Sequence, residues 1–340
     1  MTGRANIVHI TAYVFLAVLI VIVMNYGAEL LKPIAWASIF SFIMLPLCKK
    51  LEKWRLSRPL ASLVGTLVFM ISTTLILGFL VYQSVHILQN EHILEGVSKE
   101  DVGVLLDSVE QRFGLELFEF SDASTAFKKF LGIVAGKISG ISQEVVILTL
   151  IPMYLFFLLN YRGLFWRFIN ARYEGENLEH VRMTFQKSYL SIHQYLSGTG
   201  ILTVVTLVMT FLILLAFGIK YAFFFSVFLA VLNLIPFIGN LLSFAVILVF
   251  VWGAEGALYA LYVGIALYAA NLVQENFLRP LLVGTKMEMN AAVVFTSVIA
   301  GGLIWGLAGM VLFIPLVGIA KAFFDSNPDW KSYSVFFESK

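Results

Sequence analysis

Long stretches without a charged side chain constrain this chain more than any other feature. Eight such stretches are strongly apolar, at residues 10–28, 33–48, 59–90, 145–161, 188–219, 221–254, 256–274 and 289–320. A membrane-crossing helix needs about 20 mostly apolar residues, and 60% of the 340 residues are hydrophobic while 13% are charged. None of the stretches alternates apolar and polar residues, which argues against a β-barrel. The sequence therefore predicts an all-α, polytopic helical membrane protein with about eight spans.

The stretch at residues 221–254 contains an interruption that a spanning helix rarely tolerates. Its middle reads NLIPFIGN, with Asn233, Pro236, Gly239 and Asn240. Proline removes a backbone donor and clashes with the carbonyl one turn earlier, and lipid cannot satisfy the backbone groups that are freed. We predict two arms of about 14 residues, each too short to cross with ease, that form a re-entrant hairpin with its tip near residues 236–240. Two full spans joined by a surface turn are the alternative.

The last apolar stretch is interrupted in a similar way. Residues 289–320 contain AGGLIWGLAG, and the interruption comprises Gly301, Gly302, Gly306, Gly309 and the later Pro315. We expect a second broken hairpin that enters from the cytoplasmic side, whereas the first enters from the opposite side. Paired interrupted segments with opposite entry are typical of a solute site near the bilayer midplane. Glycines that allow two helices to pack closely are the alternative explanation.

The loop after the second apolar stretch predicts the orientation. It reads KKLEKWRLSR at residues 49–58 and holds five basic residues against one acidic residue. Because short loops rich in lysine and arginine stay in the cytoplasm, we expect this loop and both chain termini inside. The Arg-rich residues 162–187 are also expected inside, either as a helix on the membrane surface or as a solvated helix with one buried face.

Amide side chains near the first break are candidates for a solute or ion pathway. Asn233 and Asn240 flank the break, and an amide can hydrogen-bond a small polyol or bind a cation through its oxygen. Capping of the interrupted helix ends is the alternative role. Pro236 and Gly239 are assigned to the same pathway because they shape the break.

A second polar group ends the span at residues 256–274. Asn271, Glu275, Asn276 and Arg279 lie there, beside Gln274. Glu275 and Arg279 are four residues apart and share one helix face. A carboxylate at membrane depth is costly, which makes Glu275 a candidate for proton or cation coupling. An exposed ion pair at the end of a span is the alternative.

Motifs for catalysis are absent from the sequence. There is no HExxH metal motif and no phosphate-binding loop with lysine, and aspartate occurs only at positions 101, 107, 122, 325 and 329, outside the apolar stretches. The single cysteine, Cys48, excludes an intramolecular disulfide. We therefore expect no enzyme, no cofactor, no metal site and no nucleic-acid partner. A carrier and a passive channel or scaffold both stay open.

Several blocks of sequence, in their order and spacing, resemble the AI-2E transporters, also called the autoinducer-2 exporter family. The blocks are LLKPIAWASIFSFIMLPLCKKLEKWRLSRPLAS, IPMYLFFLL, YLSGTGILTVV, FGIKYAFFFSVFLAVLNLIPFIGN and NFLRPLLVGTKMEMNAAVVFTSVIAGGLIWGLAGMVLFIPLVGIAKAFF. The resemblance covers about residues 30–324. It implies a multi-span protein of the bacterial inner membrane that forms homo-oligomers, with pentamers implied.

The same resemblance implies two kinds of substrate. Some members resemble exporters of the quorum signal autoinducer-2, and others resemble Na⁺(Li⁺)/H⁺ antiporters. Three positions depart from the family pattern: Asn240 where proline is frequent, Thr199 where a residue such as glutamine is common, and residues 160–163 where a Lys-Asp-Gly-like turn is usual. The first two fall where a substrate could be contacted, so they concern the ligand more than the fold.

These expectations divide the chain into five parts. Residues 1–90 are expected to be scaffold spans, and residues 91–144 an extramembrane amphipathic helical segment. Residues 145–187 hold the fourth span and a cytoplasmic surface helix, and residues 188–324 form a transport core with both hairpins. Residues 325–340 are a cytoplasmic tail, expected on the inner membrane surface. The expected partners are the lipid bilayer, a small-molecule or cation substrate, and further copies of the chain.

Overall fold

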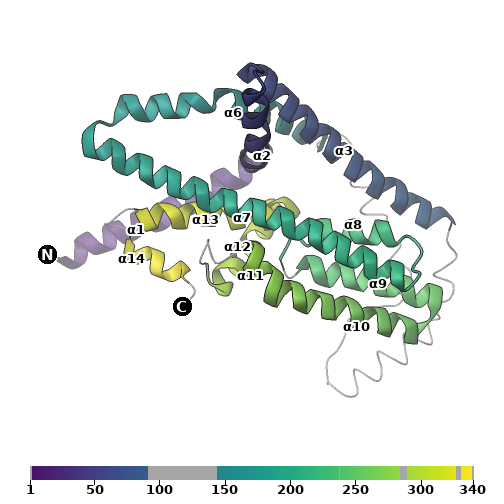
Figure 1. Cartoon of the computed structure of the whole chain (residues 1–340). Helices are drawn as coiled ribbons and strands as arrows, with labels where there is room; N and C mark the ends of the chain where they lie inside the picture. The colour runs from purple at the N-terminus through teal and green to yellow at the C-terminus, as the bar shows by residue number, and fades with distance from the viewer. Residues whose placement is uncertain (1, 91–143, 237, 284–288, 327–330, 339–340) are drawn as a thin grey trace. The chain divides into compact units, whose positions relative to one another are not determined.

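A computed structural model describes residues 2–90, 144–236, 238–283, 289–326 and 331–338. Helices make up nearly all of these residues, and the described residues contain no strand, only one isolated bridge between Met289 and Glu338. The predicted extramembrane segment at residues 91–144 lies outside the described residues, apart from residue 144. The all-α class is therefore confirmed (Figure 1).

The chain forms two compact units. Unit 1 comprises the described residues of Met1–Met70, Val145–Leu196 and Thr285–Lys340, and unit 2 those of Ile71–Glu144 and Ser197–Gly284. Unit 1 contains α1 (Thr2–Tyr26), α2 (Ala28–Lys53), α6 (Glu144–Arg172), α12 (Ala291–Trp305), α13 (Leu307–Ser326), α14 (Lys331–Ser334) and the 3₁₀ turn η3 (Val335–Phe337). Unit 2 contains α8 (Ala222–Leu232), α9 (Ile238–Glu255), α10 (Ala257–Val273), the π-helix η2 (Gln274–Leu278) and α11 (Arg279–Leu282). Two long helices, α3 (Arg58–Asn90) and α7 (Gly175–Ala216), begin in unit 1 and end in unit 2.

Many of these helices have the length and composition of membrane spans. Five in the described part of the chain qualify: Ala28–Lys53, Arg58–Ile87, Ile192–Ala216, Ile238–Glu255 and Ala257–Leu282. Three shorter apolar helices accompany them, at Ala222–Leu232, Ala291–Trp305 and Leu307–Lys321. This pattern confirms a polytopic helical membrane protein.

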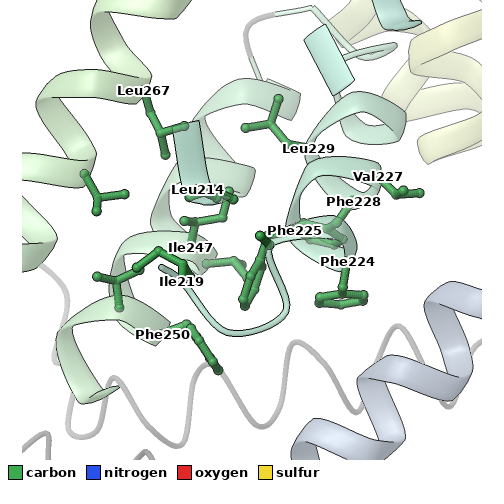
Figure 2. Close-up of a cluster of buried hydrophobic side chains, with 14 of the residues drawn as sticks. Leu214, Ile219, Phe224, Phe225, Val227, Phe228, Leu229, Ile247, Phe250 and Leu267 are labelled. Carbon is green, nitrogen blue, oxygen red and sulfur yellow. The ribbon is translucent and has the colours of Figure 1, made fainter. Parts of the chain in front are cut away.

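The core of unit 2 surrounds α8. From Phe224 to Ala230 every residue of this helix is buried, and Phe225 and Phe250 pack with ring centroids 4.6 Å apart (Figure 2). A helix that is apolar on every side is stable only when protein or lipid covers it all round, and here other parts of unit 2 cover α8, including Leu214, Ile247 and Val263. With 11 residues, α8 is about 16 Å long, which is too short to cross a bilayer.

Unit 1 is held together by the α12–α13 hairpin and by contacts of α2 with α6. In the hairpin, Trp305 packs edge-on against Phe313 and donates its indole N–H to the carbonyl of Met24, at 2.8 Å. Between α2 and α6, the guanidinium of Arg162 forms a bidentate ion pair with the carboxylate of Glu52.

The C-terminal tail makes contacts that the sequence did not predict. The backbone N–H of Asn290 donates to the carbonyl of Phe337 at 2.8 Å, and its side-chain amide donates to the carbonyl of Phe336 at 2.9 Å. The rings of Tyr333 and Phe337 pack on Phe324 of α13. The tail therefore folds back onto the start of α12, and its predicted position on the inner membrane surface stays a prediction.

Candidate substrate site

The interruption at NLIPFIGN forms a tight turn between two antiparallel helices. Phe250 of α9 packs against both Tyr221 and Phe225 at the start of α8, so the two arms run side by side. The arms have 11 and 18 residues rather than 14 each, because α9 begins only two residues after Pro236. The predicted hairpin is therefore present, and its re-entrant insertion into the bilayer stays a prediction.

Gly239 makes the turn possible. A Cβ built on this residue would lie 1.8 Å from the carbonyl oxygen of Leu232, the last residue of α8. The turn is closed by backbone hydrogen bonds from Gly239 N–H to the carbonyl of Ile235 (3.0 Å) and from Ile238 N–H to the carbonyl of Pro236 (2.7 Å). Any side chain at position 239 would push the arms apart, so Gly239 shapes the turn. Pro236 also shapes it, because its carbonyl accepts one of these two hydrogen bonds.

Asn233 occupies the C-terminal end of α8, at the start of this turn. Its backbone N–H donates to the carbonyl of Leu229 at 2.8 Å. The side chain is 8% exposed, and its Oδ1 has no hydrogen-bond partner within the described part of the chain. A buried amide oxygen without a partner costs about 1–3 kcal/mol. The oxygen makes no capping bond here, so it is available to an external donor.

Two amides on α10 and η2 extend the polar surface from this turn. Asn240 of α9 donates its side-chain amide to Oδ1 of Asn271 at 2.9 Å. One helical turn further, the hydroxyl of Thr206 on α7 donates to Oε1 of Gln274 at 2.7 Å. Gln274 is 4% exposed, and its Nε2 has no acceptor among the described residues. These five residues, Thr206, Asn233, Asn240, Asn271 and Gln274, are called the amide cluster below.

Gln274 is also the first residue of a π-helix. A π-helical turn inserts one extra residue into a helix and is frequent at functional sites. The helix after it is held close to α7, since a Cβ on Gly198 would lie 2.4 Å from the carbonyl oxygen of Leu282. Gln274 thus meets Thr206 of α7, and the two backbones nearly touch about two turns away, at Gly198 and Leu282.

On α7, only Thr199 was predicted from the sequence as a position where a substrate could be contacted. Thr199, Thr203, Thr206 and Thr210 follow one another at three- and four-residue spacing and so share one face of the helix. Thr206 and Thr210 are buried, and the buried Oγ1 of Thr199 has no partner within the described chain. The recurrence of threonine within an uncharged stretch was the available signal.

The remaining predicted residues on this helix point elsewhere. Glu275 and Arg279 form an i,i+4 ion pair with distances of 2.6 and 2.8 Å, and their side chains are 36% and 32% exposed. Asn276 is exposed and donates its amide to the carbonyl of Leu272. These three residues are not part of the amide cluster, and the coupling role of Glu275 stays a prediction.

The second broken segment is also a tight helical hairpin, in unit 1. Gly306 ends α12 with φ 65°, a left-handed conformation that glycine adopts without strain. Gly301 and Gly309 let the two arms touch, since a Cβ on either residue would lie about 2 Å from the other's carbonyl oxygen, at 2.2 and 2.0 Å. Gly302 contacts Met310 in the same interface.

Both explanations offered for this glycine-rich stretch therefore apply. Gly306 is the break, and Gly301, Gly302 and Gly309 serve close packing. Pro315 lies buried within α13 and does not end the helix. The two hairpins belong to different units, so their convergence on one site stays a prediction.

The amide cluster contains only amides and a hydroxyl. Its buried atoms that lack a partner among the described residues are an acceptor, Asn233 Oδ1, and an N–H group, Gln274 Nε2. Such a surface can exchange hydrogen bonds with a small neutral polar molecule. In the described part of the chain, no group of three His, Cys, Asp or Glu residues is arranged to hold a metal ion.

Comparison with known sequences decides the family. The sequence model of the AI-2E family transporter matches residues 10–329, nearly the whole chain. This chain belongs to the AI-2E transporter family. Membership makes it a transporter of the membrane-embedded, multi-pass type, in agreement with its apolar helices.

Two proteins named for transport match nearly the whole chain, and a third matches part of it. The AI-2 transport protein TqsA of Escherichia coli K12 is 25% identical over 335 residues, which cover 95% of this chain and 94% of TqsA. YhhT of the same strain, also named for transport, is 24% identical over 320 residues, or 92% and 89% of the two chains. A Haemophilus influenzae protein is 30% identical over 140 residues, or 41% of this chain and 40% of that protein.

Proposed function

We propose that this AI-2E transporter exports a small, neutral, hydroxyl-rich solute of the autoinducer-2 type by alternating access. The amide cluster is the docking site. Its residues lie on four helices of unit 2 and next to the turn of the α8–α9 hairpin. The similarity to TqsA, which is named an AI-2 transport protein, supports this substrate class.

The observation that carries the proposal is a pair of unpartnered buried groups in one cluster. Asn233 Oδ1 can accept a hydrogen bond and Gln274 Nε2 can donate one, and neither has a partner among the described residues. A polyol both donates and accepts, so it can satisfy both groups at once. The free energy lost by burying each group is then recovered when the solute binds.

The hairpin geometry supports a carrier that changes conformation rather than a channel that stays open. The α8–α9 turn is closed by Gly239, and α8 is buried within unit 2, so solute reaches the cluster only when helices separate. We propose that unit 2 carries the solute between the two membrane faces while the oligomer, a pentamer as the family implies, holds a scaffold that includes the N-terminal spans. Saturable transport is the consequence that separates this carrier from a passive channel.

Exchange of Na⁺ or Li⁺ for H⁺ is the second candidate, and Glu275 is the residue on which it depends. Arg279 donates to both of its carboxylate oxygens, at 2.6 and 2.8 Å, so neither oxygen is without a protein partner. The amide cluster itself has no ionisable side chain. Both features favour a neutral solute over a proton-coupled cation.

Transport in proteoliposomes tests the proposal. We expect Gln274→Leu to lower autoinducer-2 transport by about two- to tenfold, because a hydrogen bond to the solute contributes about 0.5–1.5 kcal/mol. Ser226→Ala is the matched control, since Ser226 is also buried in unit 2 but, within the described residues, donates to its own helix, at the carbonyl of Ala222. Equal transport by the two variants would contradict the docking site.

A further inference from the structure

Unit 1 contains a large cavity that the transport proposal does not use. It has a volume of about 1040 Å³ and lies between the end of α2, the second half of α6 and the first turns of α7. Pockets that enclose a drug-sized molecule measure about 300–1,000 Å³, so this one accommodates a long or bulky ligand. In Figure 1, α6 and α7 diverge from the bend that joins them. Residues of both helices line the cavity.

Most of the cavity wall is apolar and aromatic. Leu45, Leu158 and Phe168 line it, together with Phe165, which packs edge-on against Phe185 of α7 with ring centroids 4.9 Å apart. In addition, Phe42 of α2 lies 5.7 Å from the Tyr189 ring of α7. A hydrocarbon chain can therefore lie along the wall without leaving a polar group unsatisfied.

One edge of the cavity is basic. Lys49, Arg58 and Arg162 line it, and no acidic residue does. Arg162 is already bound by Glu52, whereas neither Lys49 nor Arg58 has an acidic partner among the described residues. Two uncompensated positive charges at the edge of an apolar cavity are complementary to an amphiphile with an anionic head and an apolar tail.

Each cation lies against another residue of the cavity lining. The Lys49 ammonium lies over the Tyr189 ring, 5.8 Å from its centroid. The Arg58 guanidinium lies against Gly163, where a Cβ would be 3.0 Å from Nη1. Burial raises the pKa of the Tyr189 phenol, so this group stays neutral and can donate a hydrogen bond to an anion.

We propose that this cavity binds an anionic phospholipid of the inner leaflet. The lipid phosphate lies between Lys49 and Arg58, and an acyl chain extends along Leu45, Leu158 and Phe165. The basic loop at residues 49–58 is expected on the cytoplasmic side, where anionic lipids attract basic residues, and basic pockets between helices on that side bind lipid head groups. This site is independent of the amide cluster, which lies in unit 2, and of the transport proposal.

Two double variants of one loop separate a pocket from a general surface effect. Lys49→Gln with Arg58→Gln removes the two cations of the cavity. Lys50→Gln with Arg55→Gln removes the same charge from exposed residues that do not line the cavity, and serves as the matched control. Leu158→Trp keeps every charge but fills the apolar part of the cavity, so it tests the acyl chain separately.

The measurement is native mass spectrometry of the full-length purified protein, reconstituted in nanodiscs that contain phosphatidylglycerol and phosphatidylethanolamine. We expect retained phosphatidylglycerol to fall about 30-fold in the cavity double variant, since each basic residue near an anionic membrane contributes about a factor of five. We also expect a clear loss in Leu158→Trp, little change in the control pair, and no competition by inorganic phosphate.

Several outcomes overturn the proposal. If both double variants lose phosphatidylglycerol equally, the effect is one of general surface charge and not of the cavity. If the wild-type protein retains phosphatidylethanolamine as well as phosphatidylglycerol, the two cations do not select the lipid. Competition by inorganic phosphate assigns the edge to a free anion instead. If a second copy of the chain fills the cavity instead, the cavity variants will change the mass of the oligomer without changing the amount of bound lipid. Melting curves show whether a variant loses phosphatidylglycerol because it unfolds. If it does, competition by inorganic phosphate is measured on the wild-type protein, and that result decides between a lipid and a free anion.

Discussion

Replacement of Gly239 by alanine is the sharpest test of the α8–α9 turn. The new Cβ lies 1.8 Å from the carbonyl oxygen of Leu232, whereas ordinary contact begins at 3.4 Å. The obstructing atom belongs to the backbone, so no side-chain rotation relieves the clash. The two arms must therefore separate at the point where Asn233 and Asn240 are positioned.

The expected cost combines two opposing effects. Overpacking of a close contact costs about 1–3 kcal/mol, while the change from glycine to alanine restricts the unfolded chain and returns about 0.4–1 kcal/mol. A net destabilisation of about 1–2 kcal/mol corresponds to a fall in the unfolding midpoint of about 2–8 °C. Transport should fall more steeply than stability, because the turn also positions the amide cluster.

The assay compares Gly239→Ala with Gly78→Ala. Gly78 lies on α3 in the same unit, and a Cβ built there meets nothing within 4 Å. We expect the Gly78 variant to match or slightly exceed the wild-type midpoint in detergent, and to transport normally in proteoliposomes. If Gly239→Ala behaves like Gly78→Ala in both measurements, the tight turn and its role in positioning the cluster are both refuted.

Three further predictions concern other parts of the chain. Gly301→Ala should destabilise the α12–α13 hairpin by about 1–3 kcal/mol, because the new Cβ lies 2.2 Å from the carbonyl oxygen of Gly309; an unchanged melting midpoint would remove the close-packing role. Glu275→Gln should leave solute transport unchanged and alter only a Na⁺- or H⁺-dependent component, so complete loss of coupled flux with an intact oligomer would favour the antiporter. Asn290→Asp keeps the cap of α12, where Oδ1 accepts from the N–H of Val293 at 2.8 Å, but removes the amide that donates to the tail. Hydrogen exchange should therefore speed up at residues 331–338 and not in α12, whereas equal exchange in both proteins would exclude the amide as a tail anchor.

The hairpin could be predicted from sequence because its signals are local. Pro236 and Gly239 act on the backbone within a turn, and the uncharged flanks exclude an ordinary loop. Local rules also predicted the spans from uncharged length and the Glu275–Arg279 pair from spacing. The arm lengths were less predictable, since the end of α8 depends on how closely Leu232 packs against Gly239.

Asn233, Asn240 and Asn271 of the amide cluster were predicted as pathway residues, whereas the contribution of Thr206 and Gln274 could not be predicted from such rules. Thr206 and Gln274 are 68 residues apart in the chain and meet only because the π-helix turns Gln274 toward α7. A π-helical turn has no reliable sequence signal, so Asn276 was assigned to the pathway and Gln274 was not. Tertiary packing buries Gln274 and leaves Asn276 exposed. It also forms the cavity of unit 1, whose walls come from helices distant in sequence.

A density map of the full-length oligomer with autoinducer-2 bound tests the central claim most directly. The account predicts ordered solute density within hydrogen-bond distance of both Asn233 Oδ1 and Gln274 Nε2, and no such density in the Gln274→Leu protein. Solute density at a site that touches neither amide, with the cluster unchanged between the bound and free maps, would contradict it.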